Sequence, residues 1–539
     1  MELAKNQEHT VTIEGYGEGG MGVARIDGRV VFVHGALRGE KCRVLILKTL
    51  KSVAFAKVLE VLEPSSERIE SDCPYFPRCG GCTYRHIRYE EELRLKRQRV
   101  QDNLSRIGGS DVAVEEILGA QDTLRYRNKA QYPVSKDGRV GFYRARTHEV
   151  IECEHCLLVK PEADAAAEAL REYMQSCRVA GYDEKTGRGF IRHLYVRSNA
   201  AGESLICVLV NGDKLPKEDW LVALLRDACP KCTGIVLGTN TKKGNVILGN
   251  RYRTLWGSDR LEDTLCGKTF RLSVPSFYQV NRVQAERLYA KAIEFAGLTG
   301  QETVLDLYCG AGTITLALSD HAKKVLGAEI VPEAIDDARE NAARNGVKNA
   351  EFFCGDASDV AKKLARENLR PDVITVDPPR KGLAADVVES IAEMQPGRVV
   401  YVSCDSATMA RDVKRFADLG YTAQRACAVD MFPRADHVET VCLLSKLQSK
   451  EHIEIEVKMD ELDLTLAESK ATYGEIREYV LEHTGLKVSH LYIAQVKQKY
   501  GIIERENYNK PKSENAKQPQ CPPEKEEAIT EALKHFGMI

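Results

Sequence analysis

The chain has 539 residues, of which 43% are hydrophobic and 29% charged, with a formal net charge of −2 and a pI of about 6.7. This length is too great for one hydrophobic core, so we expect three or four domains. The near-neutral charge excludes attraction of a polyanion by the whole molecule, and a nucleic-acid partner would have to meet local basic patches. A solvated charged face is the alternative interpretation of such a patch. The candidates are Arg85, Arg88, Arg94, Lys96, Arg97 and Arg99, and a second group of Arg125, Arg127 and Lys129.

The first residues contain no apolar stretch typical of a signal peptide, and no run of about 18 apolar residues follows. We therefore expect a cytoplasmic protein with no membrane association. Disulfides are not expected in a reducing compartment, although the chain has 17 cysteines. Most of these cysteines are expected to be small buried residues. The clustered cysteines need a separate explanation.

Residues 1–62 are predicted to form a small all-β domain, because short apolar strands such as residues 10–13 and 29–33 alternate with glycines. The segment EGYGEGGMGVARIDGRVVFVHGALRGEKCRV resembles the TRAM domain, an OB-like barrel of RNA-modifying enzymes. Such barrels bind nucleic acid on a strand face and its loops. A purely structural appendage is the alternative interpretation.

Residues 63–265 are predicted to form a mixed α/β central domain. A Pro- and Cys-rich segment comes first, followed by a charged helix over residues 91–107. A second helix is expected near residues 161–177, with strands at 205–210 and 234–237.

Residues 266–446 alternate strands with helices, which predicts βαβ units on a mainly parallel, Rossmann-like sheet. Within this range five acidic or nucleophilic residues each follow a short apolar run. The carboxyl ends of parallel strands meet at one edge of a doubly wound sheet, so we expect these side chains to line one ligand crevice there. An N-cap role is the alternative for the acids, above all for Asp356. The five residues are Asp306, Glu329, Asp356, Asp377 and Cys404.

A glycine loop, DLYCGAGT, follows the first of these strands and precedes a helix that is predicted to begin near Thr313. Gly310 and Gly312 let the backbone approach a ligand closely. Glu329 stands about 20 residues further on, where a carboxylate can accept hydrogen bonds from ribose hydroxyls. The spacing alone would also suit a dinucleotide. The pattern D-x-x-C-G-x-G-T, without a third glycine, resembles the S-adenosylmethionine motif of methyltransferases.

Two further motifs narrow the chemistry. The loop Asp377-Pro378-Pro379 resembles the DPP loop of enzymes that methylate nitrogen, but Arg380 stands where those enzymes have an aromatic residue, which disfavours an exocyclic amine. The remaining resemblance is to the uracil-5 RNA methyltransferases, and within them to the branch that acts on 23S ribosomal RNA. It is carried in order by SFYQVN (276–281), DLYCGAGT (306–313), DPPRKG (377–382), YVSCD (401–405) and FPRADHVET (432–440).

This resemblance implies covalent catalysis. Uracil C5 is a poor nucleophile, and addition of a thiolate to C6 turns the ring into an enolate whose charge reaches C5. The resemblance assigns Cys404 as the nucleophile and Glu439 as the base that removes the C5 proton. A free thiol is only slightly ionised at pH 7, so we expect Cys404 to have a depressed pKa or a nearby base. A small buried residue at a strand end is the alternative for Cys404.

The resemblance also implies that Gln279, Tyr308, Glu329 and Asp377 contact S-adenosylmethionine. Asp377 either orients the methyl donor or hydrogen-bonds the uracil edge, and the sequence does not separate these roles. His437 is expected to be structural. The target uracil must leave any base stack, which implies base flipping or a single-stranded loop.

A second cysteine group has the spacing Cys73-x5-Cys79-x2-Cys82, with Cys156 far downstream. Four thiolates hold either a tetrahedral zinc or a [4Fe-4S] cluster, and the spacing does not separate these two metals. The resembling family has the same spacing and binds an iron–sulfur cluster, so the resemblance implies a [4Fe-4S] cluster in this chain. Cys153 is the alternative fourth ligand.

Residues 447–539 are predicted to form a helical extension of unknown role. Two amphipathic helices, over residues 473–480 and 488–497, flank a Gly turn, and a third lies near 525–536. Helix–turn–helix spacing suggests a nucleic-acid module, and a protein-docking appendage is the alternative. The phosphate contacts would be Lys497, Lys499, Arg505, Lys510 and Lys512.

The sequence therefore predicts a monomeric enzyme, without an obligate protein partner, that makes 5-methyluridine in 23S ribosomal RNA. Transfer RNA is the alternative substrate, which the cysteine group disfavours because relatives that act on transfer RNA often lack one. A non-catalytic RNA-binding iron–sulfur protein is the third interpretation, and the presence of both Cys404 and Glu439 argues against it.

Overall fold

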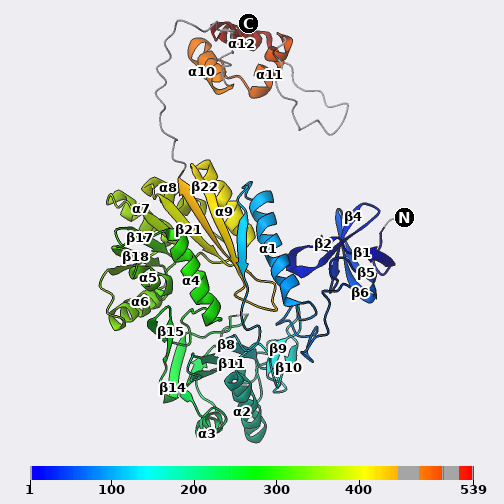
Figure 1. Cartoon of the computed structure of the whole chain (residues 1–539), viewed down its shortest axis with the longest axis vertical. Coiled ribbons are helices and arrows are strands. Elements are labelled where there is room, and N and C mark those ends of the chain that lie inside the picture. The colour runs from blue at the N-terminus through cyan, green and yellow to red at the C-terminus, as the bar shows by residue number, and fades with distance from the viewer. Residues whose placement is uncertain (1–2, 245, 447–472, 501, 503–520, 537) are drawn as a thin grey trace. The chain divides into compact units, whose positions relative to one another are not determined.

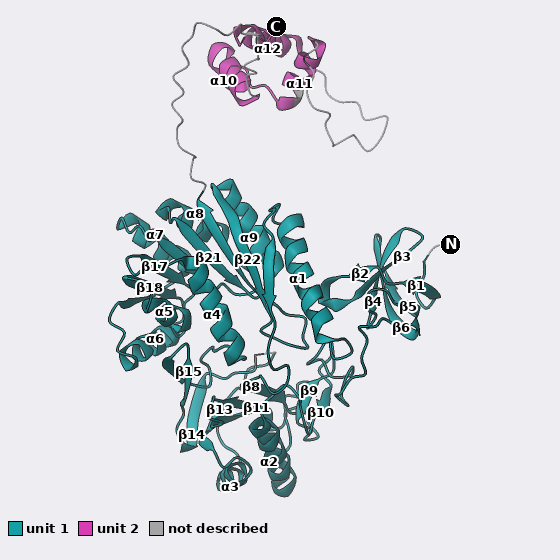
Figure 2. Ribbon diagram, viewed as in Figure 1, with its two compact units in different colours: residues 1–448 teal, residues 449–539 magenta. Residues whose placement is uncertain are grey.

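The computed structural model describes residues 3–244, 246–446, 473–500, 502, 521–536 and 538–539. The chain divides into two compact units, residues 1–448 and 449–539 (Figure 2). Among the described residues no helix is long and apolar enough to cross a membrane. The 17 cysteines, all among the described residues, are free thiols in this structure.

The N-terminal strands form one six-stranded sheet in the order β1-β5-β6-β4-β3-β2. On β5 the buried residues Cys42, Val44 and Ile46 alternate with exposed ones, so one face of the sheet packs a core of small aliphatic side chains. The predicted all-β region is confirmed. The strands are β1 (Glu8–Thr12), β2 (Gly15–Tyr16), β3 (Gly22–Ile26), β4 (Arg29–His34), β5 (Lys41–Thr49) and β6 (Val53–Glu63).

Helix α1 (Tyr89–Arg106) follows a segment with little regular structure and packs against α9 of the catalytic sheet. The predicted charged helix is present, but Lys96 of the candidate basic patch is fully buried between the carboxylates of Glu92 and Asp430. Arg85, just before the helix, is also buried. The first candidate basic patch is therefore only partly at the surface.

The central sheet has five strands in the order β14-β13-β12-β11-β8. Every residue of β11 and β12 is buried, because α2 and α3 cover one face and residues 247–274 pack on the other. The predicted helix and both predicted strands are present. The elements are β8 (Lys129–Pro133), α2 (Pro161–Cys177), β11 (Ile191–Ser198), β12 (Ser204–Val210), α3 (Glu218–Ala228), β13 (Cys232–Thr239) and β14 (Arg251–Gly257), with two small hairpins, β9 (Gly141–Tyr143) with β10 (Val150–Glu152) and β15 (Leu261–Leu265) with β16 (Lys268–Leu272).

The largest sheet has eight strands in the order β19-β18-β17-β20-β21-β23-β22-β7. Strands β19 to β21 are parallel, and β23 is inserted antiparallel between β21 and β22. Helices lie on both faces of this sheet (Figure 1), and a separate hydrophobic core packs on each face. This arrangement is the predicted doubly wound α/β fold.

Helices α4, α5 and α6 cover one face of this sheet, and α1, α7, α8 and α9 cover the other. The strands are β7 (Val114–Leu118), β17 (Thr303–Leu307), β18 (Lys324–Glu329), β19 (Ala350–Cys354), β20 (Val373–Val376), β21 (Arg398–Ser403), β22 (Tyr421–Val429) and β23 (Glu439–Lys446). The helices are α4 (Arg282–Ala296), α5 (Thr313–Ser319), α6 (Pro332–Arg344), α7 (Ala357–Arg366), α8 (Ala385–Met394) and α9 (Ser406–Asp418).

The five residues expected at strand ends stand at the carboxyl ends of β17 to β21, as predicted. Two of them differ from the expected role. Asp306 lies inside β17, buried, where its carboxylate accepts hydrogen bonds from Thr315 Oγ1 (2.6 Å) and Thr375 Oγ1 (2.8 Å). Asp356 is the N-cap of α7, with its carboxylate accepting from the Ser358 amide. Asp306 thus connects β17 to α5 and β20, and Asp356 stabilises the first turn of α7.

The second unit contains the three helices α10 (Tyr473–Thr484), α11 (His490–Lys499) and α12 (Pro523–His535) around a core of its own. Gly485, in the left-handed region, ends α10, and Ser489 caps α11, as the Gly turn predicts. One expected phosphate contact is wrong, because Lys497 is buried, whereas Lys499 is exposed and pairs with Glu526. The other three, Arg505, Lys510 and Lys512, lie outside the described residues.

Candidate active site

Cys404 stands on the tight turn between β21 and α9, at the carboxyl edge of the sheet. The turn is closed on both sides of the cysteine. Asp405 caps α9 by accepting from the amides of Ala407 (3.0 Å) and Thr408 (3.1 Å), and Ser403 Oγ donates to the Asp405 carbonyl (2.9 Å). The thiol is therefore held in place and half-buried at the crevice.

Glu439 begins β23 and lies beside Cys404 through the pairing of β23 with β21, in which Thr440 opposes Ser403. Its side chain is buried, with 3% exposed. Among the described residues nothing hydrogen-bonds its carboxyl group. Glu439 is thus a buried carboxyl group without a protein partner, next to the candidate nucleophile.

The electrostatics of the crevice are set by buried negative charge. Burial, helped by Asp377, raises the pKa of Glu439 from 4.5 to about 8, and burial near Asp306 raises that of Asp377 from 3.8 to about 7. Burial and these two carboxylates raise the pKa of Cys404 to about 11, while Arg380 opposes the shift. The depressed thiol pKa expected from the sequence is not found. The alternative, a nearby base, has candidates in Glu439 and Asp377.

Arg380 is the cation of the site. It follows the two prolines after β20, and its guanidinium lies 3.2 Å from Nε2 of His437. It lowers the pKa of both Cys404 and Glu439, so its charge reaches both groups. The sequence pointed to Arg380 only as a departure from an aromatic residue.

The loop after β17 leaves room for a ligand. Gly310 and Gly312 both have positive φ (54° and 83°), and no atom lies within 4 Å of the position a Cβ would take on Gly310. Tyr308 also has positive φ (68°), a strained conformation for a bulky residue. Glu329, at the end of β18, accepts from the amides of Gly310 (3.3 Å) and Val331 (3.0 Å).

Two exposed apolar residues near these groups were not predicted. Ile330 directly follows Glu329 and is 59% exposed, and Phe277 precedes the buried Gln279 by two residues and is 65% exposed. Single exposed apolar side chains are common at protein surfaces, so neither residue by itself marks a binding surface. Their signal in the sequence is weak, namely an apolar residue directly after a strand or inside a polar loop.

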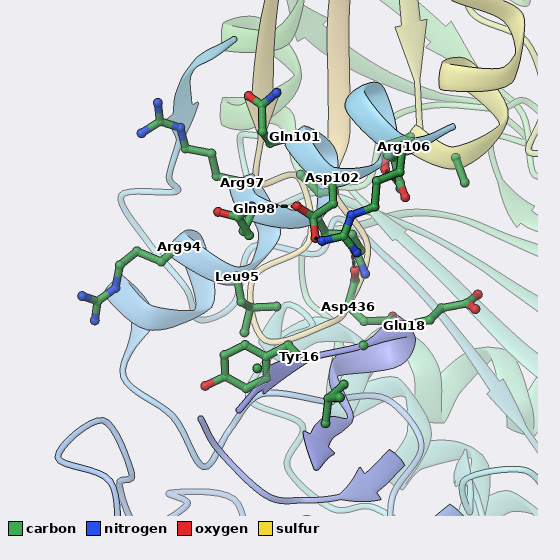
Figure 3. A pocket seen from close by; sticks show the side chains of 18 of the residues that line it. Tyr16, Glu18, Arg94, Leu95, Arg97, Gln98, Gln101, Asp102, Arg106 and Asp436 are labelled. Carbon is green, nitrogen blue, oxygen red and sulfur yellow. Dashed lines mark hydrogen bonds and ion pairs between the residues drawn. The ribbon is translucent and has the colours of Figure 1, made fainter. Parts of the chain in front are cut away.

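A groove of about 1240 Å³ leads from Cys404 to the N-terminal sheet. Figure 3 shows Arg97, Gln101 and Arg106 of α1 along one side and Tyr16 and Glu18 across from them. Arg380, Cys404 and His437 line the end at the crevice. The groove thus joins the candidate nucleophile to the β-domain that resembles an RNA-binding module.

A second cavity, of about 70 Å³, is lined by the clustered cysteines. It brings together all four expected ligands and also the alternative one. Within the described ranges, no three His, Cys, Asp or Glu side chains converge closely enough to hold a single metal ion. The cysteines that line the cavity are Cys73, Cys79, Cys82, Cys153 and Cys156.

Two arginines also line this cavity. Arg85 is buried, and its Nε and Nη2 have no hydrogen-bond partner, while its Nη1 donates to Asp72 (2.6 Å). Arg127 has a buried Nε that is likewise unpartnered. A hydrogen bond from Cys153 lowers the pKa of Cys156 to about 6. Unpaired buried N–H groups are costly, so these donors indicate a missing acceptor.

The doubly wound sheet with a glycine loop and an acidic strand end defines a methyltransferase fold, and the Cys–Glu crevice sets it apart from amine-methylating enzymes. The chain belongs to the tRNA (Uracil-5-)-methyltransferase family, whose sequence profile matches residues 88–447. Residues 3–59 match the TRAM domain, as the sequence predicts. The protein is an S-adenosylmethionine-dependent RNA (uracil-5-)-methyltransferase.

Several relatives support this assignment. An uncharacterized RNA methyltransferase of Clostridium acetobutylicum is 40% identical over 83% of this chain and 98% of its own length. One from Listeria innocua is 42% identical over 82% of this chain and 98% of its own. The crystal structure of Pyrococcus abyssi tRNA (uracil-54, C5)-methyltransferase with S-adenosyl-L-homocysteine is 27% identical, with a TM-score of 0.66, over 81% of this chain and all of that one.

The buried Glu439 predicts a pH-dependent stability. Its pKa of about 8 in the folded protein lies above its ordinary value of 4.5, so its stabilising contribution is complete below about pH 4.5 and is lost as the pH rises through 8. Glu439→Gln removes this loss. We expect the melting temperature of the wild type to fall more steeply than that of Glu439→Gln between about pH 5 and about pH 8, the range that the two pKa values bound.

Differential scanning fluorimetry across this range measures the difference. Glu333→Gln, at an exposed position in the first turn of α6, is the matched control and should follow the wild type. Parallel curves for wild type and Glu439→Gln would show that the carboxyl group is not held in its protonated form.

Proposed function

We propose that this enzyme methylates C5 of a specific uridine in 23S ribosomal RNA through a covalent bond between Cys404 and C6. The observation that carries the proposal is the crevice itself, in which a half-buried thiol lies beside a buried carboxyl group that has no protein partner. Covalent catalysis at a pyrimidine needs a nucleophile for addition and a base for elimination.

In the addition step the Cys404 thiol loses its proton and the sulfur forms a bond to C6. The C5–C6 π electrons move onto C5 and O4 to give an enolate. Because the thiol pKa is about 11, deprotonation must be coupled to substrate binding, and the nearby carboxylate of Asp377 accepts the proton, which leaves Glu439 for the closing step. Arg380 stabilises the thiolate and the developing enolate charge.

Methyl transfer follows at C5. S-adenosylmethionine would supply an electrophilic methyl group on a sulfonium. The C5 carbon would form a bond to this methyl group as the sulfur–methyl bond breaks, and S-adenosyl-L-homocysteine would leave. The residues proposed to hold it are Glu329, at the ribose position after β18, with Tyr308, Gln279 and Asp377 around the glycine loop. The open space at Gly310 fits such a ligand, because a side chain there would fill it.

The closing step is elimination. C5 now carries a methyl group and a proton, and Glu439 as carboxylate removes the proton. The C–H electrons re-form the C5–C6 double bond, and the C6–S bond breaks to return the Cys404 thiolate. A carboxyl group with a pKa of about 8 is a stronger base than an exposed glutamate, which suits this step.

The groove along α1 is the proposed path of the RNA strand that flanks the target base. It ends at Cys404 and begins at the TRAM domain. Its lining mixes arginines and acids, so shape and hydrogen bonding would contribute together with phosphate contacts. The target uracil would be flipped out to reach the crevice.

The cysteine cavity is proposed to hold a [4Fe-4S] cluster on Cys73, Cys79, Cys82 and Cys156. Four thiolates suit either a tetrahedral zinc or an iron–sulfur cluster, and the resemblance to the cluster-binding family favours the cluster. The unpaired N–H groups of Arg85 and Arg127 suit an anionic group of this kind.

The choice of 23S over transfer RNA rests on the cysteine pattern and its likeness to the ribosomal branch. Transfer RNA stays as the second candidate, because the Pyrococcus abyssi enzyme acts on it and shares the fold over most of this chain.

Methylation of purified RNAs tests the target. We expect labelled methyl groups from S-adenosylmethionine to appear as 5-methyluridine at a discrete position of 23S RNA, mapped by nuclease digestion and mass spectrometry. Transfer RNA should stay at the background given by Cys404→Ala. Efficient methylation of transfer RNA with 23S RNA at background would replace the first target by the second.

Anaerobic purification tests the cluster. We expect about four irons per chain and the broad visible absorbance of an iron–sulfur cluster. Cys79→Ser should lose both, whereas Cys177→Ser, which changes a cysteine outside the cavity, should keep both. A colourless protein with one zinc would contradict the cluster assignment.

A further inference from the structure

The first half of the loop that leads to Glu439 is held by hydrogen bonds to other segments of the chain. Residues 430–438 connect β22 to β23, and Glu439 is the first residue after them. All five backbone carbonyls from residue 430 to residue 434 accept a hydrogen bond from outside the loop. The donors, in order, are Gln284 Nε2 (3.0 Å), Asn281 Nδ2 (3.2 Å), Lys96 Nζ (3.1 Å), Tyr126 Oη (3.0 Å), and the amides of Thr83 (2.7 Å) and Tyr84 (3.0 Å).

Lys96 is at the centre of this arrangement. Its ammonium group is fully buried and lies 2.7 Å from Glu92 Oε1, 2.7 Å from Asp430 Oδ1 and 3.1 Å from the Phe432 carbonyl. Three acceptors thus satisfy its three protons. Glu92 and Lys96 come from α1, whereas Asp430 begins the loop.

Both carboxylates have further partners. Asp430 Oδ2 accepts from the Tyr89 hydroxyl (2.6 Å), and Glu92 Oε1 accepts from the backbone amide of Arg434 (2.7 Å). The guanidinium of Arg434 lies 3.5 Å from Glu92 Oε2. Glu92 is therefore hydrogen-bonded to the middle of the loop, at Arg434, and Asp430 connects the start of the loop to α1.

A buried ion pair contributes little net stability, because the cost of removing the charges from water offsets their attraction. An apolar cluster of equal volume would hold α1 against the sheet at least as well. An ion cluster differs from such packing in fixing direction, since each hydrogen bond sets one atom of the loop relative to α1. The ion cluster therefore serves to fix the position of the loop relative to α1 rather than to stabilise the fold.

We propose that Lys96, with Glu92 and Asp430, is a positioning group for Glu439 and that its effect falls on the elimination step. This inference rests on the proposed role of Glu439. Cys404 stands on a different turn, closed by Asp405. Helix α1 reaches the start of α9 through Asn103, whose Nδ2 donates to Ser406 Oγ (2.8 Å), but no described member of the Lys96 cluster bonds to Cys404. Addition and methyl transfer should therefore be less sensitive to the cluster than removal of the C5 proton.

Single-turnover kinetics with uridine-containing RNA and labelled S-adenosylmethionine separate these steps. A denaturing gel follows the methylated protein–RNA adduct and the free methylated RNA. We expect Lys96→Met to slow adduct resolution about 10–100-fold, because a displaced base loses much of its effect, while adduct formation changes less than about threefold. The methylated adduct should accumulate.

Two further variants guard against an effect of misfolding. Tyr89→Phe removes one hydrogen bond to Asp430 and should slow resolution in the same direction but less. Glu40→Gln disturbs a matched buried carboxylate, paired with Arg68 at 2.6 and 2.8 Å in the TRAM domain. It should lower the melting temperature and leave the ratio of the two rates unchanged.

Glu439→Gln is the reference that separates the two claims. If it accumulates no methylated adduct, the proposed base is wrong. If it does so while Lys96→Met resolves its adduct as fast as the wild type, or loses formation and resolution in parallel, only the positioning role fails.

Discussion

The site depends on negative charge that is buried at the carboxyl edge of one sheet. Burial raises the pKa of Asp306 to about 6, of Asp377 to about 7 and of Glu439 to about 8. The first of these carboxyl groups accepts hydrogen bonds from two threonine hydroxyls, whereas no described residue hydrogen-bonds the carboxyl groups of the other two. Charge held there without partners destabilises the fold and is available for chemistry.

Arg380 opposes the pKa shifts that burial causes. Among the described residues, its charge lowers the pKa of both the Cys404 thiol and the Glu439 carboxyl group. A sulfonium cation entering beside the glycine loop would add a second positive charge.

Much of the catalytic domain could be predicted from the sequence, because apolar runs ending in Asp377 and Cys404 follow directly from strand periodicity and loop chemistry. The glycine loop and the cap at Asp356 are local signals of the same kind. Contacts between distant segments were not predictable. Lys96 belongs to a charged helix, and its burial depends on Asp430, which follows it by more than 300 residues.

The same reason explains the missed groove. The groove is lined by residues of the TRAM domain, of α1 and of the loop before β23. No local sequence pattern predicts that these three segments lie next to one another. The cysteine spacing, by contrast, predicted the gathering of Cys73, Cys79, Cys82 and Cys156 around one cavity, although it did not reveal the two unpaired arginines. Cysteine spacing in the sequence therefore predicts which thiols gather at one site. It does not predict which charged side chains from distant segments lie beside them.

The central claim, that Cys404 bonds to C6 of the target uracil, is tested most directly by trapping with 5-fluorouridine. Fluorine at C5 cannot leave as a proton, so elimination is blocked after methyl transfer. RNA containing 5-fluorouridine should give a complex that survives denaturation, and mass spectrometry of the digested complex should place a methylated fluorouridine on the peptide that contains Cys404. An adduct on another cysteine, or equal trapping by Cys404→Ala, would contradict the account.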